Sequence, residues 1–139
     1  MEIRNLMIGD WVICNDLKMQ VAAIGETVGF LDCYNQVYWA YEGFDRIEPI
    51  PLTEQILVKN GFEYAFNEVS KMQNKQLLVA NIGSHYIEVH LDKKNVAIWC
   101  DYDENGDGVC SDILIDLPHH VHNFQHLLRL CGIEKELTI

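Results

Sequence analysis

Short apolar segments alternate with turn residues throughout the first 50 positions of the chain. Asn, Asp and Gly stand between these segments, and they favour tight reversals because they tolerate positive φ or hydrogen-bond their own backbone. Short strands at this spacing predict a small, strongly bent antiparallel sheet or barrel. The expected strands are residues 11–14, 19–24, 27–31, 36–41 and 44–50.

The segment Pro49-Ile50-Pro51 separates this part of the chain from the rest. Its two prolines remove two backbone donors and force extended backbone around Ile50. A short helix is predicted directly afterwards, at residues 54–60. Thr53 can cap its exposed amides, and Asn60-Gly61 supplies a left-handed stop.

Alternation of apolar and polar positions returns in the second half of the chain. The segment Tyr86–Leu91 is the clearest case, because its apolar residues would share one face of a strand and its polar residues the other. The segment Asp92–Asn95 then predicts a hairpin. The expected strands are residues 76–80, 85–91, 95–100 and 112–117.

An amphipathic helix is predicted between Pro118, which suits a first helical turn, and Gly132, which suits a helix end. We expect its apolar stripe to pack on the second sheet and its polar side to face solvent. The stripe comprises Val121, Phe124, Leu127, Leu128 and Cys131, and the polar side comprises His122, Gln125, His126 and Arg129.

Together these elements predict an α+β protein with two lobes. The first, at residues 1–50, is expected to be a small SH3-like antiparallel β barrel, because Gly9-Asp10-Trp11-Val12 resembles the first strand of such barrels. The second, at residues 51–139, is expected to contain a helix, an antiparallel sheet and a C-terminal helix.

Acidic residues outnumber basic ones by 21 to 10, which gives a formal net charge of −11. Non-specific nucleic-acid binding depends on basic groups that release phosphate counterions, so this balance argues against nucleic acid as a partner. It also argues against binding to anionic membrane surfaces. Scattered cysteines without a Cys-x-x-Cys pair, and the lack of a signal-peptide pattern, predict a reduced, cytoplasmic protein.

The segment Asp101–Asp112 follows the spacing of an EF-hand calcium loop, with Gly106 at the position of the sharp bend. Its candidate ligands are Asp101, Asp103, Asn105, Asp107 and Asp112. The last ligand position holds Asp where Glu is usual, and the flanks are β-like, whereas an EF-hand requires helices. The two hypotheses are a weak calcium site and an acidic connection between strands, of which we favour the second.

Four of the six histidines lie in the segment Pro118–His126. His122 and His126 are four residues apart, so they share a helix face with a spacing that suits a transition metal. The alternative is an exposed polar face that changes charge near pH ~6.5. We expect the polar face, and His122 and His126 are its candidate interaction residues.

Motifs of covalent or phosphoryl chemistry are absent from the sequence, which contains no Gly-x-Ser-x-Gly, no P-loop and no dinucleotide-binding glycine pattern. The sequence therefore predicts a protein without enzymatic activity. Aromatic residues of the first lobe suit either a peptide groove or a barrel core, and we expect Trp11 and Trp39 in the core. The others in this group are Tyr34, Tyr38, Tyr41 and Phe44.

Three segments carry a resemblance to a known family: residues 1–12, residues 47–62, and Val121-His122 followed by Gln125 and Leu127. On these segments the chain resembles a family of small proteins from gut Bacteroidetes and their prophages or other mobile elements. That family has no established activity, so the resemblance implies an SH3-like N-terminal lobe and an origin. His120 stands where the family has a tyrosine, and the Asp-rich segment is not part of the family pattern.

We therefore expect a non-enzymatic cytoplasmic binding or assembly module, encoded by a prophage or mobile element. It would act through contacts with a partner protein and would need no cofactor. The alternative is a calcium-binding domain that uses the segment Asp101–Asp112. A nucleic-acid-directed role would need a local basic patch, which the sequence lacks.

Overall fold

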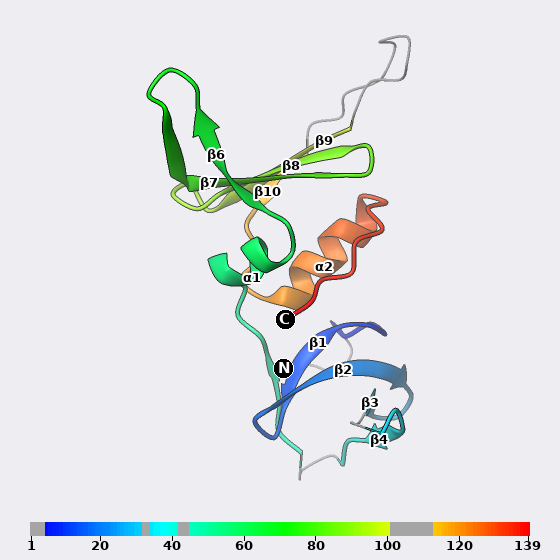
Figure 1. Cartoon of the computed structure of the whole chain (residues 1–139). Coiled ribbons are helices and arrows are strands. Elements are labelled where there is room, and N and C mark those ends of the chain that lie inside the picture. Colours follow the sequence, from blue (N-terminus) through cyan, green and yellow to red (C-terminus); the bar gives the residue numbers. More distant parts are fainter. Residues whose placement is uncertain (1–4, 32–33, 42–44, 101–112) are drawn as a thin grey trace.

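The computed structural model describes residues 5–31, 34–41, 45–100 and 113–139. Two five-stranded antiparallel sheets and two short helices make up this part of the chain. Figure 1 shows the two sheets at opposite ends of the molecule, with both helices between them. The predicted α+β class is confirmed.

The first sheet has the strand order β4-β3-β2-β1-β5. Neighbouring strands are antiparallel, and a bulge in β2 between Val21 and Ala23 shifts the register against β3. Because β4 and β5 lie at opposite edges, the described strands form an open, bent sheet and no closed barrel. The strands are β1 (Trp11–Cys14), β2 (Leu17–Ile24), β3 (Val28–Leu31), β4 (Val37–Trp39) and β5 (Ile47–Pro49).

Helix α1 (Glu54–Lys59) follows the proline segment, as predicted. The Thr53 side chain accepts a hydrogen bond from the Ile56 amide, and Gly61 adopts the positive φ of a helix stop. The residues before and after the helix therefore act as predicted.

The second sheet has the strand order β10-β9-β8-β7-β6. The strands are β6 (Glu63–Asn67), β7 (Met72–Ile82), β8 (His85–His90), β9 (Asn95–Cys100) and β10 (Ile113–Asp116). Strand β6 was not predicted, and β7 begins earlier than the sequence pattern indicated. Strands β9 and β10 pair directly, so the flanks of the acidic segment are strands, as predicted.

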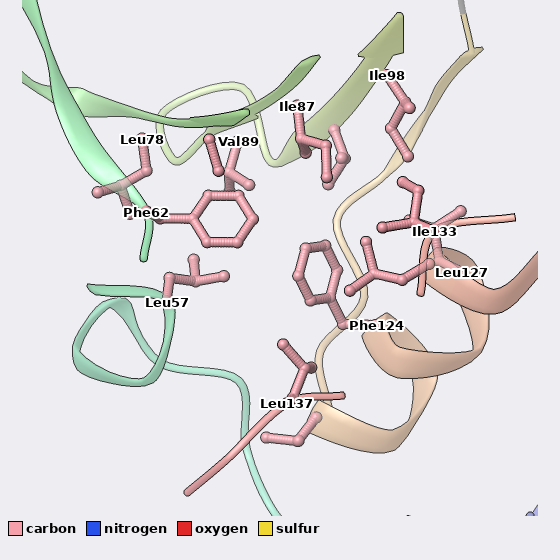
Figure 2. Packing of buried hydrophobic residues seen from close by; sticks show 14 of the residues in the cluster. Leu57, Phe62, Leu78, Ile87, Val89, Ile98, Phe124, Leu127, Ile133 and Leu137 are labelled. Carbon is pink, nitrogen blue, oxygen red and sulfur yellow. The ribbon is translucent and has the colours of Figure 1, made fainter. Parts of the chain in front are cut away.

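Helix α2 (Val121–Leu130) packs its apolar stripe against the second sheet. Figure 2 shows Phe124 from α2 facing Phe62 across the core, and the ring centroids lie 6.0 Å apart. The helix begins three residues beyond Pro118, because His120 has extended backbone and serves as the N-cap. This core is the larger of two apolar clusters.

Residues 133–139, here called the C-terminal segment, complete the second core. Ile133 and Leu137 are buried among the apolar side chains of α1, α2 and the sheet. Gln125 holds the backbone between them: its Nε2 donates to the Lys135 carbonyl at 2.7 Å, and its Oε1 accepts from the Leu137 amide at 2.6 Å. A buried amide side chain thus ties the segment to α2.

Asn60 holds the same segment one residue further along. Its Nδ2 donates to the Thr138 carbonyl at 2.7 Å, and its Oδ1 accepts from the Thr138 amide at 2.8 Å. Both amide side chains are buried, so their polar atoms depend on these protein partners. The end of α1 and the middle of α2 are therefore bridged by one extended segment.

Replacement of Gln125 by Ala should destabilise the protein by about 3 kcal/mol, because it leaves a buried amide and a buried carbonyl without partners. Urea unfolding followed by circular dichroism measures the change. Gln55→Ala, at an exposed position of α1, serves as control and should change stability by less than about 0.5 kcal/mol. Equal stabilities for Gln125→Ala and the parent chain would contradict this description of the segment.

Candidate functional site

The first sheet has two faces with different neighbours. On β1, Val12 and Cys14 point into the smaller core, whereas Trp11 and Ile13 point the other way and pack against the second core. The Trp11 indole Nε1 also donates to the Leu137 carbonyl at 2.9 Å. The outer face of β1 is thus covered by α2 and the C-terminal segment.

The same face is exposed further along the sheet, where β2, β3 and β4 lie away from the second lobe (Figure 1). Val28 and Phe30 point into the smaller core, so Gly29 between them belongs to the opposite face. A Cβ atom built on Gly29 would lie next to Val37, Trp39 and Ala23, so these three side chains lie on that opposite face too. Leu31 pairs with Val37 and follows Gly29 at the spacing of the same face. We call Ala23, Leu31, Val37 and Trp39 the outer patch.

The outer patch is apolar and accessible. Leu31, Val37 and Trp39 are 40%, 47% and 45% exposed, respectively. A Cβ at Gly29 would lie 2.6 Å from the Val37 Cγ1 and 3.3 Å from the Trp39 ring. Glycine at this position therefore lets both side chains lie against the sheet.

Trp39 was expected in the core, and this expectation is wrong. Its neighbour Tyr38 pairs with the core residue Phe30, so Trp39 points to the opposite face, where Gly29 leaves room for the indole. Trp11 is partly buried at the lobe junction. Phe44 lies outside the described residues.

Asp45 holds two tyrosines at β4, of which Tyr38 points to the face opposite the outer patch. Its Oδ2 accepts from the Tyr38 hydroxyl at 2.9 Å and from the Tyr41 amide at 2.6 Å, and its Oδ1 accepts from Asn15 at 2.6 Å. These hydrogen bonds, with the one from the Tyr41 amide foremost, lower the pKa of Asp45, and the bond to Asp45 raises the pKa of Tyr38. Asp45 therefore fixes the backbone at the end of β4.

A shallow hollow adjoins the outer patch at Leu31. Its lining is mainly apolar and includes Trp11, so the hollow extends from the lobe junction to the patch. One lysine and two amide side chains supply its polar groups. The lining residues are Trp11, Leu17, Lys18, Met19, Gln20, Leu31 and Asn35.

The lobe junction contains a carboxylate that has no contact with solvent. Asp10 is 0% exposed, and its Oδ2 lies 2.7 Å from the His126 Nε2 and accepts from the Met7 amide at 2.7 Å. Its Oδ1 accepts from the Arg129 guanidinium at 3.2 Å. Burial of a charge is costly unless it is paired and hydrogen-bonded, and here both oxygens have partners.

Arg129 links three parts of the molecule. Besides Asp10 it binds Glu136 of the C-terminal segment at 2.9 Å. A Cβ atom built on Gly9 would lie 2.8 Å from the guanidinium of Arg129. Gly9 also has a positive φ of 92°. Glycine therefore suits the positive φ of the turn beside Asp10, and it leaves room for the Arg129 guanidinium.

The histidines of α2 lie at this junction. The expectation that His122 faces solvent is wrong, because its side chain is 4% exposed, and His126 is only partly exposed. The His122 ring stacks on His120 at 5.7 Å and meets His126 edge-on at 5.8 Å. Of the predicted polar side, His126 and Arg129 therefore face the first lobe, and Gln125 faces the C-terminal segment. A contact of His122 or His126 with a partner protein stays a prediction.

Burial lowers the pKa of His122, the proximity of Asp10 opposes this shift, and His126 and His120 add to it. Its Nδ1 is buried and has no hydrogen-bond partner within the described part of the chain. A protonated His122 ring would therefore have no acceptor for that nitrogen among the described residues.

Among the described residues, no three His, Cys, Asp or Glu side chains are grouped as metal ligands would be. The five candidate calcium ligands, Asp101, Asp103, Asn105, Asp107 and Asp112, lie outside the described residues, so calcium binding stays the untested alternative to an acidic connection between strands. Cys14 is a buried thiol, and burial, followed by the nearby Asp45, raises its pKa. Neither helix of the described ranges has the length and apolar composition needed to cross a bilayer.

Comparison with protein-family models, with curated proteins and with solved structures returned no match. The site is therefore defined by its geometry alone. Sequence reasoning missed Asp10 and the outer patch. In the sequence Asp10 only marks the start of the expected first strand. Its role could have been inferred from an acidic residue next to a strand together with basic residues on a distant helix, here His126 and Arg129.

Replacement of Asp10 by Ala should destabilise the protein by about 3 kcal/mol, because it leaves Arg129 and His126 partly buried without their carboxylate. Thermal and urea unfolding at pH 7.5 measure the change. Glu26→Ala, at an exposed position between β2 and β3 of the same lobe, is the matched control and should have little effect. A loss for Asp10→Ala no larger than for Glu26→Ala would contradict the role of the junction.

Proposed function

We propose that the protein is a non-enzymatic binding or assembly module and that the outer patch of the first sheet is its contact surface for a partner protein. The observation that carries this proposal is the divided face of the sheet. One half of this face is already buried against α2 and the C-terminal segment, and the other half presents Leu31, Val37 and Trp39 to solvent.

The composition of the patch supports a protein partner. Large apolar side chains that gather on one face are typical of interaction sites, and tryptophan and tyrosine are enriched where interfaces form. The neighbouring hollow can accept an apolar side chain between Trp11, Leu17 and Leu31. An extended partner segment can therefore place one side chain in the hollow and others on the patch.

The edge of the sheet supports the same proposal. Strand β4 pairs with β3 on one side and forms the other edge of the sheet within the described residues. Edge strands can accept another strand through their main-chain groups. Val37 and Trp39 would then contact the side chains of a strand added at β4.

The setting of this function rests on the sequence. The resemblance to proteins of gut Bacteroidetes and their prophages supports a role in a mobile element and an SH3-like ancestry of the first lobe. The composition supports a cytoplasmic location. No described feature favours an enzymatic or a calcium-dependent role over protein binding.

Photo-crosslinking from the outer patch tests the proposal. A photoreactive phenylalanine analogue at Val37 should give one dominant adduct in the native host, whereas the same analogue at Val69, which is 95% exposed in the β6–β7 turn, should not. The captured protein is then purified and titrated against the parent chain and against Val37→Asp.

We expect Val37→Asp to weaken this binding at least about tenfold, because it places a charge in an apolar contact. A dispersed amide spectrum identical to that of the parent chain shows that the variant is folded. The same adduct from Val69, or unchanged binding by Val37→Asp, would contradict the proposal.

A further inference from the structure

The lobe junction brings one carboxylate together with two basic side chains. Asp10 contacts the imidazole of His126 and the guanidinium of Arg129, both from α2. Both of its oxygens are occupied by these groups and by the Met7 amide. The remaining acid nearby, Glu136, pairs with Arg129 from the C-terminal segment.

The His126 ring has an acceptor, because its Nε2 lies 2.7 Å from the Asp10 carboxylate. A proton on the Nδ1 of His122 would have no such partner among the described residues. That side chain is 4% exposed, its Nδ1 has no acceptor in the described structure, and its ring lies between those of His120 and His126. A charged His122 would thus be buried beside two other imidazoles.

Water can reach His122 if the first lobe separates from α2. The apolar side of the helix packs on the second sheet, whereas the histidine side faces Asp10 and β1. Separation at this junction would leave the second core intact. It would also break the hydrogen bond between Trp11 and the Leu137 carbonyl.

We infer that His120, His122 and His126 form an acid-sensitive latch, in which protonation of His122 releases the first lobe from α2. Release uncovers Trp11 and Ile13 on the outer face of β1, directly beside the hollow and the outer patch. The latch therefore controls how much of the sheet face is accessible. The inference concerns the junction itself and holds whether or not the outer patch binds a partner.

The direction of the pH effect follows from the lowered pKa of His122. Because that pKa lies below the ordinary value of 6.5 in the docked state, the released state binds more protons over the interval just below pH 6.5. Docking is therefore most stable above pH 6.5 and weakens as the pH falls through this interval. The groups that face His122 are Asp10, His120 and His126, and only Asp10 opposes the shift.

Nuclear magnetic resonance of the full chain between pH 7.5 and pH 5.0 tests the latch. The Trp11 indole and the Ile13 methyl signals report docking, and the Leu78 and Ile87 amide signals report the second core. We expect the two docking signals to shift together with a midpoint below pH 6.5, while the core signals stay dispersed. The exposed His119 provides a control variant, His119→Gln, which should keep the same midpoint.

His122→Phe removes the buried titration and should lower the midpoint by at least about one pH unit, or abolish the transition. His126→Gln tests the inference independently should His122→Phe fail to fold. It removes a contact to Asp10 and should move the midpoint to higher pH. An unchanged midpoint in whichever of these two variants folds, no transition in the parent chain above pH 5.0, or simultaneous loss of docking and core signals would each overturn the latch.

Discussion

The arrangement of the molecule depends on one buried carboxylate. Asp10 lies at the end of the turn that leads into β1, and it has no contact with solvent. A charge in this position is tolerated only where cationic and hydrogen-bonding groups surround it. The Met7 amide belongs to the same turn, whereas the imidazole and the guanidinium come from α2. Asp10 therefore determines which side of the first sheet meets the second lobe.

The C-terminal segment strengthens this arrangement from the other side. It is held by two buried amide side chains, Gln125 and Asn60, and it accepts the hydrogen bond of the Trp11 indole. The segment contacts α1, α2 and β1, which are distant in sequence. The lobes are therefore joined by polar contacts at Asp10 and by a shared apolar boundary at Trp11 and Ile13.

The docking of the lobes decides which part of the first sheet stays accessible. Coverage ends at β1, and the bulge in β2 and the glycine in β3 shape the face beyond it. Leu31, Val37 and Trp39 lie on this uncovered part. The outer patch and the part of β1 that contacts the second lobe are thus two regions of one sheet face. Release of the lobe junction would enlarge the exposed region.

Features with local causes were predictable from the sequence. The cap at Thr53, the stop at Gly61 and the alternation along β8 depend on neighbouring residues. Strand β6 was missed because its partner β7 begins in the polar segment Met72–Gln76, which lacks an apolar alternation and suggests a loop.

The site was harder to predict because its causes are distant in sequence. His126 and Asp10 are 116 residues apart, so the sequence near His126 gives no sign of its partner. A polar helix face that contacts a buried carboxylate has the same sequence pattern as one exposed to water. Trp39 is outside the core because the register of β4 places its neighbour Tyr38 opposite the core residue Phe30. The fold class was accessible from periodicity, whereas the junction and the outer patch required tertiary structure.

The most direct test of this account measures solvent access to the two parts of the sheet face in the same sample. A neutral paramagnetic cosolute added at pH 7.5 broadens methyl signals according to their exposure. We predict strong broadening for Leu31 and Val37 and weak broadening for Ile13, with Ile13 becoming strongly broadened in Asp10→Ala. Equal broadening of Ile13 and Val37 in the parent chain would contradict the account.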